Sequence, residues 1–339
     1  MVDSVVPSPA LHKLWKRGAD FFGVPLAIMG GAMSWISERH LVSAISNGGG
    51  FGIIACGSMS PELLREEIRG TRGLTSAPFG VNLITMHPQL DLLVDVCVEE
   101  GVGHVVLAGG LPPASAVQKI KSHNMKLMCF APTVALGKKL VRMGVDALII
   151  EGMEAGGHIG PVSTSVLAQE ILPEIRDVPV FVAGGIGRGE AIVSYLEMGA
   201  SGVQLGTRFV CARECIAHEN FKKAFIRAAA RDAVPSVQID TRFPIIPVRA
   251  LANQASRRFL EKQREVVERF DRNELTKEQA QLEIEHFWAG ALRRAVIDGD
   301  VDNGSVMAGQ SVGLVKAEQS ATGILAELVQ QADHSLQRA

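Results

Sequence analysis

The sequence predicts an α/β fold, a TIM (β/α)8 barrel with a smaller helical cap domain inserted near the C-terminus. Eight short apolar runs recur at similar spacing, stretches of helical periodicity separate them, and a charged helical segment breaks this alternation late in the chain. A single barrel takes roughly 250 residues. The length of 339 residues therefore leaves room for a second compact unit.

The expected strands are rich in Val, Ile, Leu and Ala, and amphipathic stretches lie between them. Because helices cover such strands, neighbouring strands run parallel, and eight strand–helix units close into a barrel. The expected strands are residues 25–29, 51–55, 79–83, 104–108, 126–130, 147–150, 180–183 and 202–205. The expected helices are residues 61–69, 90–100, 134–142, 165–175 and 190–198.

A doubly wound parallel sheet is the alternative architecture. Such a sheet carries a GxGxxG motif directly after its first strand. Here the early glycines Gly48, Gly49, Gly50 and Gly52 precede and enter the second expected strand. The barrel is therefore favoured.

The pattern of strands and helices ends near Phe209. We expect a barrel over residues 1–216, a helical cap or substrate domain over 217–295, and a return segment with a C-terminal helix over 296–339. A proline-containing irregular stretch, residues 240–248, interrupts the cap. The small residues of 298–315 indicate backbone packed closely against a ligand or the barrel mouth.

Composition excludes several classes of function. The net charge is −2, and the 34 basic residues form no stripe, so we expect no nucleic-acid partner. No segment resembles a signal peptide or a membrane span, which predicts a soluble, cytoplasmic protein with no membrane partner. The cysteines lack CxxC spacing, so we expect reduced thiols and no metal site. They are Cys56, Cys97, Cys129, Cys211 and Cys215.

Glycine-rich loops follow the seventh and eighth expected strands, where TIM barrels commonly bind phosphate. Glycine lets backbone N–H groups approach a phosphate without a Cβ in the way. The residues are Ala183, Gly184 and Gly185 after the seventh strand, and Gln204, Gly206 and Thr207 after the eighth. A tight turn would explain the glycines of either loop alone, but glycine-rich loops at both positions together predict a phosphate cradle.

A third glycine-rich segment follows the sixth expected strand and contains a histidine. His158 comes directly after Gly156 and Gly157. An imidazole has an ordinary pKa near 6.5 and can donate or accept a proton at working pH. We therefore expect His158 to be catalytic. Glu151 and Glu154 are interpreted as supporting or backbone-anchoring carboxylates.

Two further regions suit a flat ring beside this cradle. Asn82, at the end of the third expected strand, can hydrogen-bond the polar edge of an isoalloxazine ring. The segment after the first strand offers small and apolar surface, from Gly30, Gly31, Ala32 and Met33. Core packing explains Met33 and Trp35 equally well. Cys56 is interpreted as inert packing.

A cradle for one phosphate beside a titratable group predicts a flavin mononucleotide (FMN) site. Sugar-phosphate isomerases and aldolases share this kind of phosphate site, so a phosphosugar lyase or isomerase is a further candidate. Aldolases of this fold often use a Lys at a strand end as a Schiff base. No expected strand of this chain ends in Lys, which disfavours that chemistry.

The motifs together resemble the family that joins nitronate monooxygenases with flavin-dependent enoyl-acyl-carrier-protein reductases of type II. The resemblance covers nearly the whole chain and is closer to the reductase branch in EGMEAGGHIG, SVMAGQ and the helical segment. The remaining motifs are PLAIMGGAMSWISERHLVSAISNGGGFGIIACG, PFGVNLI, VFVAGGIGRGEAI and GVQLGTRFVCARE. The reductases usually show Gln-Gly-Gly-Met before the tryptophan, whereas Gly30, Gly31, Ala32 and Met33 stand here.

The resemblance implies an FMN-containing barrel with a helical cap. It implies that the matching cradle residues hold the phosphate, that Asn82 and the loop of Met307, Gly309 and Gln310 approach the cofactor, and that His158 handles a proton. The expected activity is NAD(P)H-dependent reduction of an enoyl thioester. The expected partner is a small-molecule or acyl-thioester substrate, with acyl carrier protein as a candidate partner and a homodimer as a candidate assembly. The alternative activity is nitronate monooxygenase, which oxidises alkyl nitronates with O₂.

Overall fold

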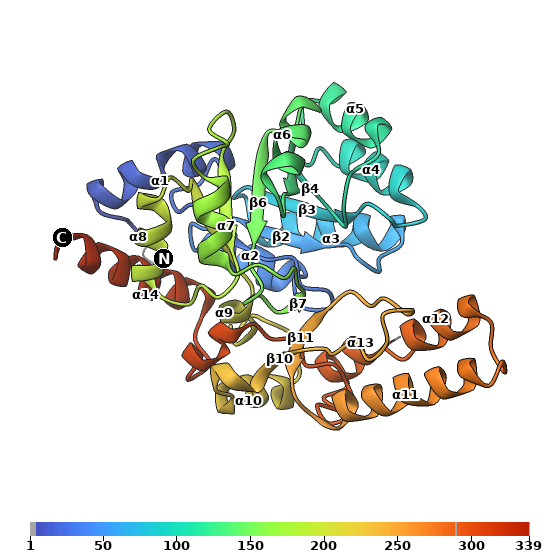
Figure 1. The fold of residues 1–339 in the computed structure, drawn as a ribbon. Helices are drawn as coiled ribbons and strands as arrows, with labels where there is room; N and C mark the ends of the chain where they lie inside the picture. The colour runs from blue at the N-terminus through green and yellow to red at the C-terminus, as the bar shows by residue number, and fades with distance from the viewer. Residues whose placement is uncertain (1–4, 289, 339) are drawn as a thin grey trace.

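Eight parallel strands form a closed barrel in the computed structural model (Figure 1). The structure describes residues 5–288 and 290–338. Neighbours around the ring follow the order β1-β9-β8-β6-β5-β4-β3-β2. A parallel bridge between Met29 and Phe51 closes it. The strands are β1 Ile28–Gly30, β2 Gly52–Ala55, β3 Phe79–Ile84, β4 His104–Ala108, β5 Lys126–Phe130, β6 Ala147–Glu151, β8 Val180–Ala183 and β9 Gly202–Leu205. The predicted TIM barrel is confirmed.

Helices cover the outside of the barrel. They begin at ordinary caps: Ser60 accepts a hydrogen bond from the Leu63 N–H at the start of α3, and Pro61 occupies the first turn. The helices are α1 Pro9–Phe22, α2 Arg39–Asn47, α3 Pro61–Leu74, α4 Leu90–Glu99, α5 Ala114–Ser122, α6 Val134–Arg142, α7 Thr164–Ile171 and α8 Gly189–Glu197. All five expected helices are present, with ends that differ by at most a few residues.

The barrel strands separate two apolar layers. Alternate residues point inward or outward, so Ile149 belongs to the interior cluster, and Leu148 and Ile150 pack with the surrounding helices. Aromatic rings from the end of α1 close the N-terminal end of the interior. There the Phe22 ring stacks on Phe51 with a centroid distance of 4.2 Å. The opposite end, where the strands finish, is the mouth.

After β9 and the short helix α9 (Thr207–Val210), the chain leaves the barrel and builds a cap. Its helices are α10 Glu219–Arg227, α11 Gln254–Asp271, α12 Lys277–His286 and α13 Ala291–Val296. Phe243 joins Phe259 and Val266 in a small apolar core of its own. The division at residues 216 and 295 stays a prediction.

The cap contains strands as well as helices, unlike the helical segment expected from its composition. β10 (Ala233–Pro235) pairs with β11 (Val248–Leu251), which pairs antiparallel with β7 (Gly157–His158). This small sheet lies where the barrel and the cap meet (Figure 1). Such short strands give little periodicity, because their partners are distant in the chain.

The chain then returns through a short helix η2 (Gln310–Leu314) to the C-terminal helix α14 (Ala321–Leu336). α14 packs against α8, as Figure 1 shows at the left of the molecule. The contact is backbone to backbone, since a Cβ on Gly189 would lie 2.2 Å from the Leu328 carbonyl oxygen. Among the helices of the described ranges, none combines the length and apolar character needed to cross a membrane.

Candidate active site

Three polar side chains point into the barrel at its mouth. Asn82, Glu151 and Gln204 each alternate with residues that pack outward, so their side chains belong to the interior face. The strand register aligns Glu151 with Ala183, and Ala183 with Gln204. Gln204 lies within β9, inside the strand expected over residues 202–205. The structure thus brings these predicted residues onto one rim.

Glu151 carries a half-buried carboxyl group at the end of β6. It takes part in no hydrogen bond or ion pair within the described residues. Burial disfavours its charged form and raises its pKa to about 8. At neutral pH the side chain is therefore mostly protonated and can donate a hydrogen bond into the mouth.

The loop after β8 presents unused backbone donors. The N–H groups of Gly185, Ile186 and Gly187, together with that of Gly206 after β9, donate to no acceptor in the part of the chain that the structure describes. Successive free N–H groups in a turn form a concave anion site. These N–H groups lie in the two glycine-rich loops for which the sequence predicts a phosphate cradle, and phosphate binding there stays a prediction.

Glycine is required in this cradle. Gly184 and Gly185 have φ angles of +97° and +72°, in the left-handed region. A Cβ on Gly184 would lie 2.9 Å from the Gly152 carbonyl oxygen, and one on Gly185 would lie 3.0 Å from the Glu154 Cβ. Glu154 is itself fixed, because its carboxylate accepts hydrogen bonds from Thr164 N–H at 2.9 Å and Oγ1 at 2.8 Å. Glu154 thus anchors backbone, as expected.

The return segment lies across this rim. Gly309 N–H donates to Thr207 Oγ1 at 3.0 Å, and Gln310 N–H donates to the Glu154 carbonyl at 2.9 Å. A Cβ on Gly156 would lie 2.6 Å from the Gly309 nitrogen. The Met307 sulfur lies 3.6 Å from the position of a Cβ on Gly157. The loops after β6, β8 and β9 and the return segment, all singled out in the sequence, therefore meet.

His158 lies in β7, on the sheet that joins the barrel to the cap. The next residue, Ile159, donates its N–H to the Pro247 carbonyl at 3.0 Å, which fixes the loop against the cap. The His158 ring reaches solvent. Even so, the surrounding protein partly desolvates it and lowers its pKa. A neutral imidazole is thus favoured at pH 7.

Arg249 was not found by sequence reasoning. It is only 2% exposed, and its Nε donates to the Met153 carbonyl at 2.9 Å. Nη1 of the same guanidinium donates to the Ala233 carbonyl. Burial lowers the pKa of Arg249. The side chain ties β10 to the loop that carries His158. No signal in the sequence indicated this role, because Arg249 lies in β11, a strand that was not predicted.

The loop after β1 contributes backbone next to the cradle. Gly31 N–H donates to the Leu205 carbonyl at 2.9 Å, and the Met33 sulfur lies 3.4 Å from the position of a Cβ on Gly206. Ala32 packs beside the interior cluster. Gly30 faces outward instead, since a Cβ there would lie 2.8 Å from the Ile45 Cδ1.

Packing was considered for both Trp35 and Cys56, and the structure gives a different outcome for each. Trp35 is 38% exposed with a φ of +67°, and the Arg293 guanidinium of the cap lies 5.8 Å from its ring centroid. Core packing is therefore wrong for Trp35. Cys56 is buried, which raises its thiol pKa to about 12, as suits inert packing.

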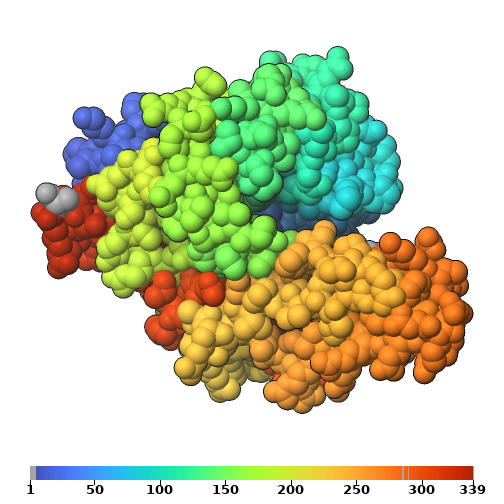
Figure 2. Space-filling model, viewed as in Figure 1, coloured from blue at the N-terminus to red at the C-terminus, as the bar shows by residue number. Residues whose placement is uncertain are grey.

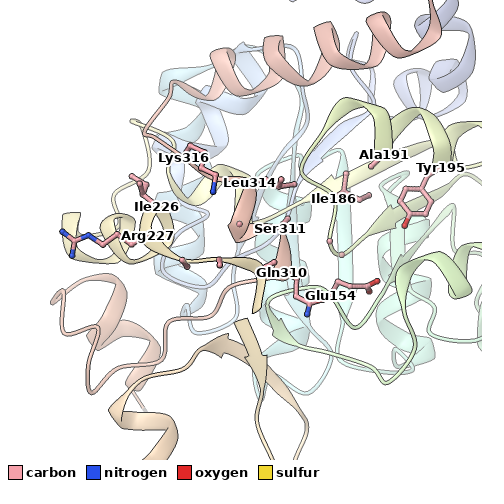
Figure 3. A pocket seen from close by; sticks show the side chains of 16 residues that line it. Glu154, Ile186, Ala191, Tyr195, Ile226, Arg227, Gln310, Ser311, Leu314 and Lys316 are labelled. Atoms are coloured by element: carbon pink, nitrogen blue, oxygen red, sulfur yellow. The ribbon is translucent and has the colours of Figure 1, made fainter. Parts of the chain in front are cut away.

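A cavity of about 650 Å³ borders the outer side of the cradle (Figure 3). Gly184, Gly185 and Gln310 line it, with Glu154 and Tyr195 beside them. His158, Asn82 and the β1 loop do not line it. This cavity therefore adjoins the predicted phosphate cradle. In the described residues, no group of three or more His, Cys, Asp or Glu side chains is placed to hold a metal ion.

The fold and these loops define a TIM-barrel enzyme with an anion cradle and a histidine on one rim. The family model for nitronate monooxygenase matches residues 16–91 and 89–331. The chain belongs to the nitronate monooxygenase family. It is therefore an oxidoreductase, which leaves the phosphosugar lyase or isomerase alternative without support.

Proteins with different names are similar to this chain. The structure of FabK from Thermotoga maritima is 34% identical with a TM-score of 0.85, over 95% of this chain and 97% of that one. A probable nitronate monooxygenase of Staphylococcus saprophyticus is 27% identical over 96% of this chain and 100% of that protein. A (3aS,4S,5R,7aS)-5-hydroxy-7a-methyl-1-oxo-octahydro-1H-indene-4-carboxyl-CoA dehydrogenase of Rhodococcus jostii is 31% identical, over 65% of this chain and 62% of that protein.

Proposed function

We propose that this chain binds FMN and reduces the double bond of an enoyl thioester with NAD(P)H. The observation that carries the proposal is the shared rim, where free N–H groups, inward polar side chains and His158 meet. The reductase branch is favoured by the similarity to FabK, a type II enoyl-acyl-carrier-protein reductase, which extends over nearly the whole chain.

The rim fits FMN in charge and in composition. The cradle offers donors for one phosphate group, and a Cβ would fill it. Asn82, Gln204 and the protonated Glu151 offer hydrogen-bonding groups for the polar edge of the ring. When bound, FMN would supply hydride transfer, from NAD(P)H to the β-carbon of an activated alkene.

His158 is the proposed proton donor to the substrate α-carbon. Burial lowers its pKa, so its protonated form is a stronger acid than free imidazolium, although less abundant at pH 7. The exposed ring can recover its proton from solvent. Arg249 and Pro247 hold the loop that presents this ring.

Nitronate monooxygenase is the second candidate. It is supported by the match to the family model and by the likeness to the Staphylococcus saprophyticus protein over 96% of this chain. A histidine that is mostly neutral at pH 7 also suits a group that accepts a proton beside a nitro group. In this activity the nitronate would be the electron donor, and O₂ the acceptor.

Substrate carriers and assembly belong to the same proposal. The acyl group would be carried by coenzyme A or by acyl carrier protein. The printed name of the Rhodococcus jostii relative contains a CoA thioester, which supports a substrate of this class. A homodimer in the cytoplasm is the state we propose for the enzyme.

The two half-reactions test the proposal when they are followed separately by flavin absorbance without oxygen. NADH or NADPH should bleach the flavin in both the parent and His158→Ala. Reoxidation by crotonyl-CoA should slow by about 10²–10⁴-fold in His158→Ala, because a positioned acid is lost. Exposed His123 provides the matched control, His123→Ala.

Two outcomes would contradict this proposal. Equal reoxidation rates in the parent and His158→Ala would make the histidine structural. Fast bleaching by an alkyl nitronate, with little bleaching by NADH or NADPH, would replace the reductase activity with the monooxygenase activity.

A further inference from the structure

The sheet that carries His158 continues into the cap. His158 in β7 stands opposite Val248 in β11, and Val234 in β10 stands opposite Ala250. Directly opposed residues of antiparallel strands share a face, and so do residues two apart in one strand. The side chains of His158, Val248, Ala250 and Val234 therefore lie on one face of this sheet.

A cavity lies against this part of the small sheet, and its lining also includes Pro235 and Leu251 from the same strands. Val234, Val248 and Ala250 all line one narrow cavity, and Trp288 and Val306 line it as well. The apolar side chains that share a face with His158 thus form the floor of a groove, and residues further along the cap form its walls. Figure 2 shows the surrounding cap in orange and yellow below the green and cyan barrel.

Several polar groups in the groove wall are engaged within the protein. Ser236 Oγ accepts the Val248 N–H at 2.9 Å. The Asn253 amide donates to the carbonyls of Val301 and Gly304, and its oxygen accepts from Ser256. No charged side chain is among the described residues that line this groove. A ligand here therefore meets largely apolar surface and no charged side chain.

The larger cavity beside the predicted phosphate cradle, unlike the groove, is lined by charged side chains. Glu154, Arg227 and Lys316 line it, so an apolar chain would have to displace water from charged groups there. Of these two cavities, the groove lined by Val248, which stands opposite His158, is the one suited to an alkyl chain.

We infer that this groove binds the acyl chain of the substrate, on the side of the double bond away from the thioester. The inference rests on the proposed function. The groove has a volume of about 40 Å³. A cavity needs about 10–15 Å³ to hold one water-sized group, so roughly three such groups fit. The enzyme should therefore prefer short acyl chains.

Equilibrium binding of saturated acyl-CoA products to the flavin-loaded enzyme tests the groove without turnover. Val234→Ala widens it, and should tighten octanoyl-CoA relative to butyryl-CoA by about tenfold. Ala250→Leu narrows it, and should weaken octanoyl-CoA by about tenfold or more, with a smaller effect on butyryl-CoA. The matched control is Val237→Ala, whose side chain is 56% exposed and outside the groove; its ratio should equal that of the parent.

The results separate this inference from the proposed function. If the ratio of the two dissociation constants is the same in Val234→Ala, Val237→Ala and the parent, the groove does not hold the chain. This comparison decides the question even if Ala250→Leu fails to fold. If the ratio shifts as expected but crotonyl-CoA does not reoxidise the flavin, acyl-chain binding in the groove is supported and the proposed reductase activity is contradicted.

Discussion

Gly185 shows how one backbone conformation governs cofactor binding. Its φ of +72° costs a non-glycine residue about 1–3 kcal/mol, and its missing Cβ leaves room beside Glu154. Gly185→Asp adds strain and also a carboxylate next to the proposed phosphate. We expect FMN occupancy to fall at least about tenfold, measured as the ratio of flavin to protein absorbance.

Gly103→Asp is the control for this prediction. It adds the same charge at an exposed position where a Cβ meets nothing within 4 Å. Full flavin content in both variants would show that Gly184 and Gly185 form an ordinary turn and not a phosphate cradle.

Single residues could be predicted from the sequence where a motif fixed their neighbours. His158, Gly184 and Gly185 stand in glycine-rich segments after barrel strands, so their common rim follows from the fold. Arg249 could not be found, because its partners are the backbone carbonyls of Met153 and Ala233, which no local pattern reveals. Their roles in binding and catalysis stay predictions.

The contact between α8 and α14 depends on Gly189, the first residue of α8. A Cβ on Gly189 would lie 2.2 Å from Leu328 O and 2.3 Å from Ala332 N, and no rotamer change can relieve a clash with backbone. Gly189→Ala should therefore push the helices apart and lower the free energy of unfolding by about 1–3 kcal/mol. Urea unfolding followed by circular dichroism measures this loss.

Gly73→Ala is the opposite case within a helix. Gly73 lies in α3, and a Cβ there meets nothing within 4 Å. The substitution should stabilise the protein by about 0.4–1 kcal/mol, since alanine loses less backbone entropy on folding. Equal effects of the two substitutions would contradict the close helix contact.

Elements could be predicted where they are long or follow the barrel repeat. All eight expected barrel strands are present because each is an apolar run of four or more residues between helices. β7, β10 and β11 were missed, since they lie outside the barrel repeat and pair with partners far apart in the chain, such as His158 with Val248. The cap was therefore expected to be helical alone.

The stability of the whole molecule should depend on pH through His104. This residue is 8% exposed at the closed end of the barrel, and burial lowers its pKa to about 4, while its Nε2 bonds the Phe21 carbonyl at 2.9 Å. In the unfolded chain the imidazole has a pKa near 6.5. Between pH 6.5 and 4 the unfolded state binds a proton that the folded state excludes, so stability falls as pH drops, by up to about 3 kcal/mol.

Urea midpoints at pH 7 and pH 4.5 measure this dependence. His104→Gln keeps a hydrogen-bond donor but cannot titrate, so its stability should fall less than that of the parent. His123→Gln, at an exposed position, should behave as the parent does. If His104→Gln and the parent lose stability equally, other groups carry the pH dependence.

The placement of α14 has a consequence for protein synthesis. β9 completes the ring of strands at Leu205, but only the four residues of α9 follow it directly, and α14 packs on α8 from residues 321–336. While the ribosome is still translating the cap, the nascent barrel has all its strands and lacks one of its covering helices. The apolar side chains that α14 covers are then exposed to water until residues 321–336 have been made.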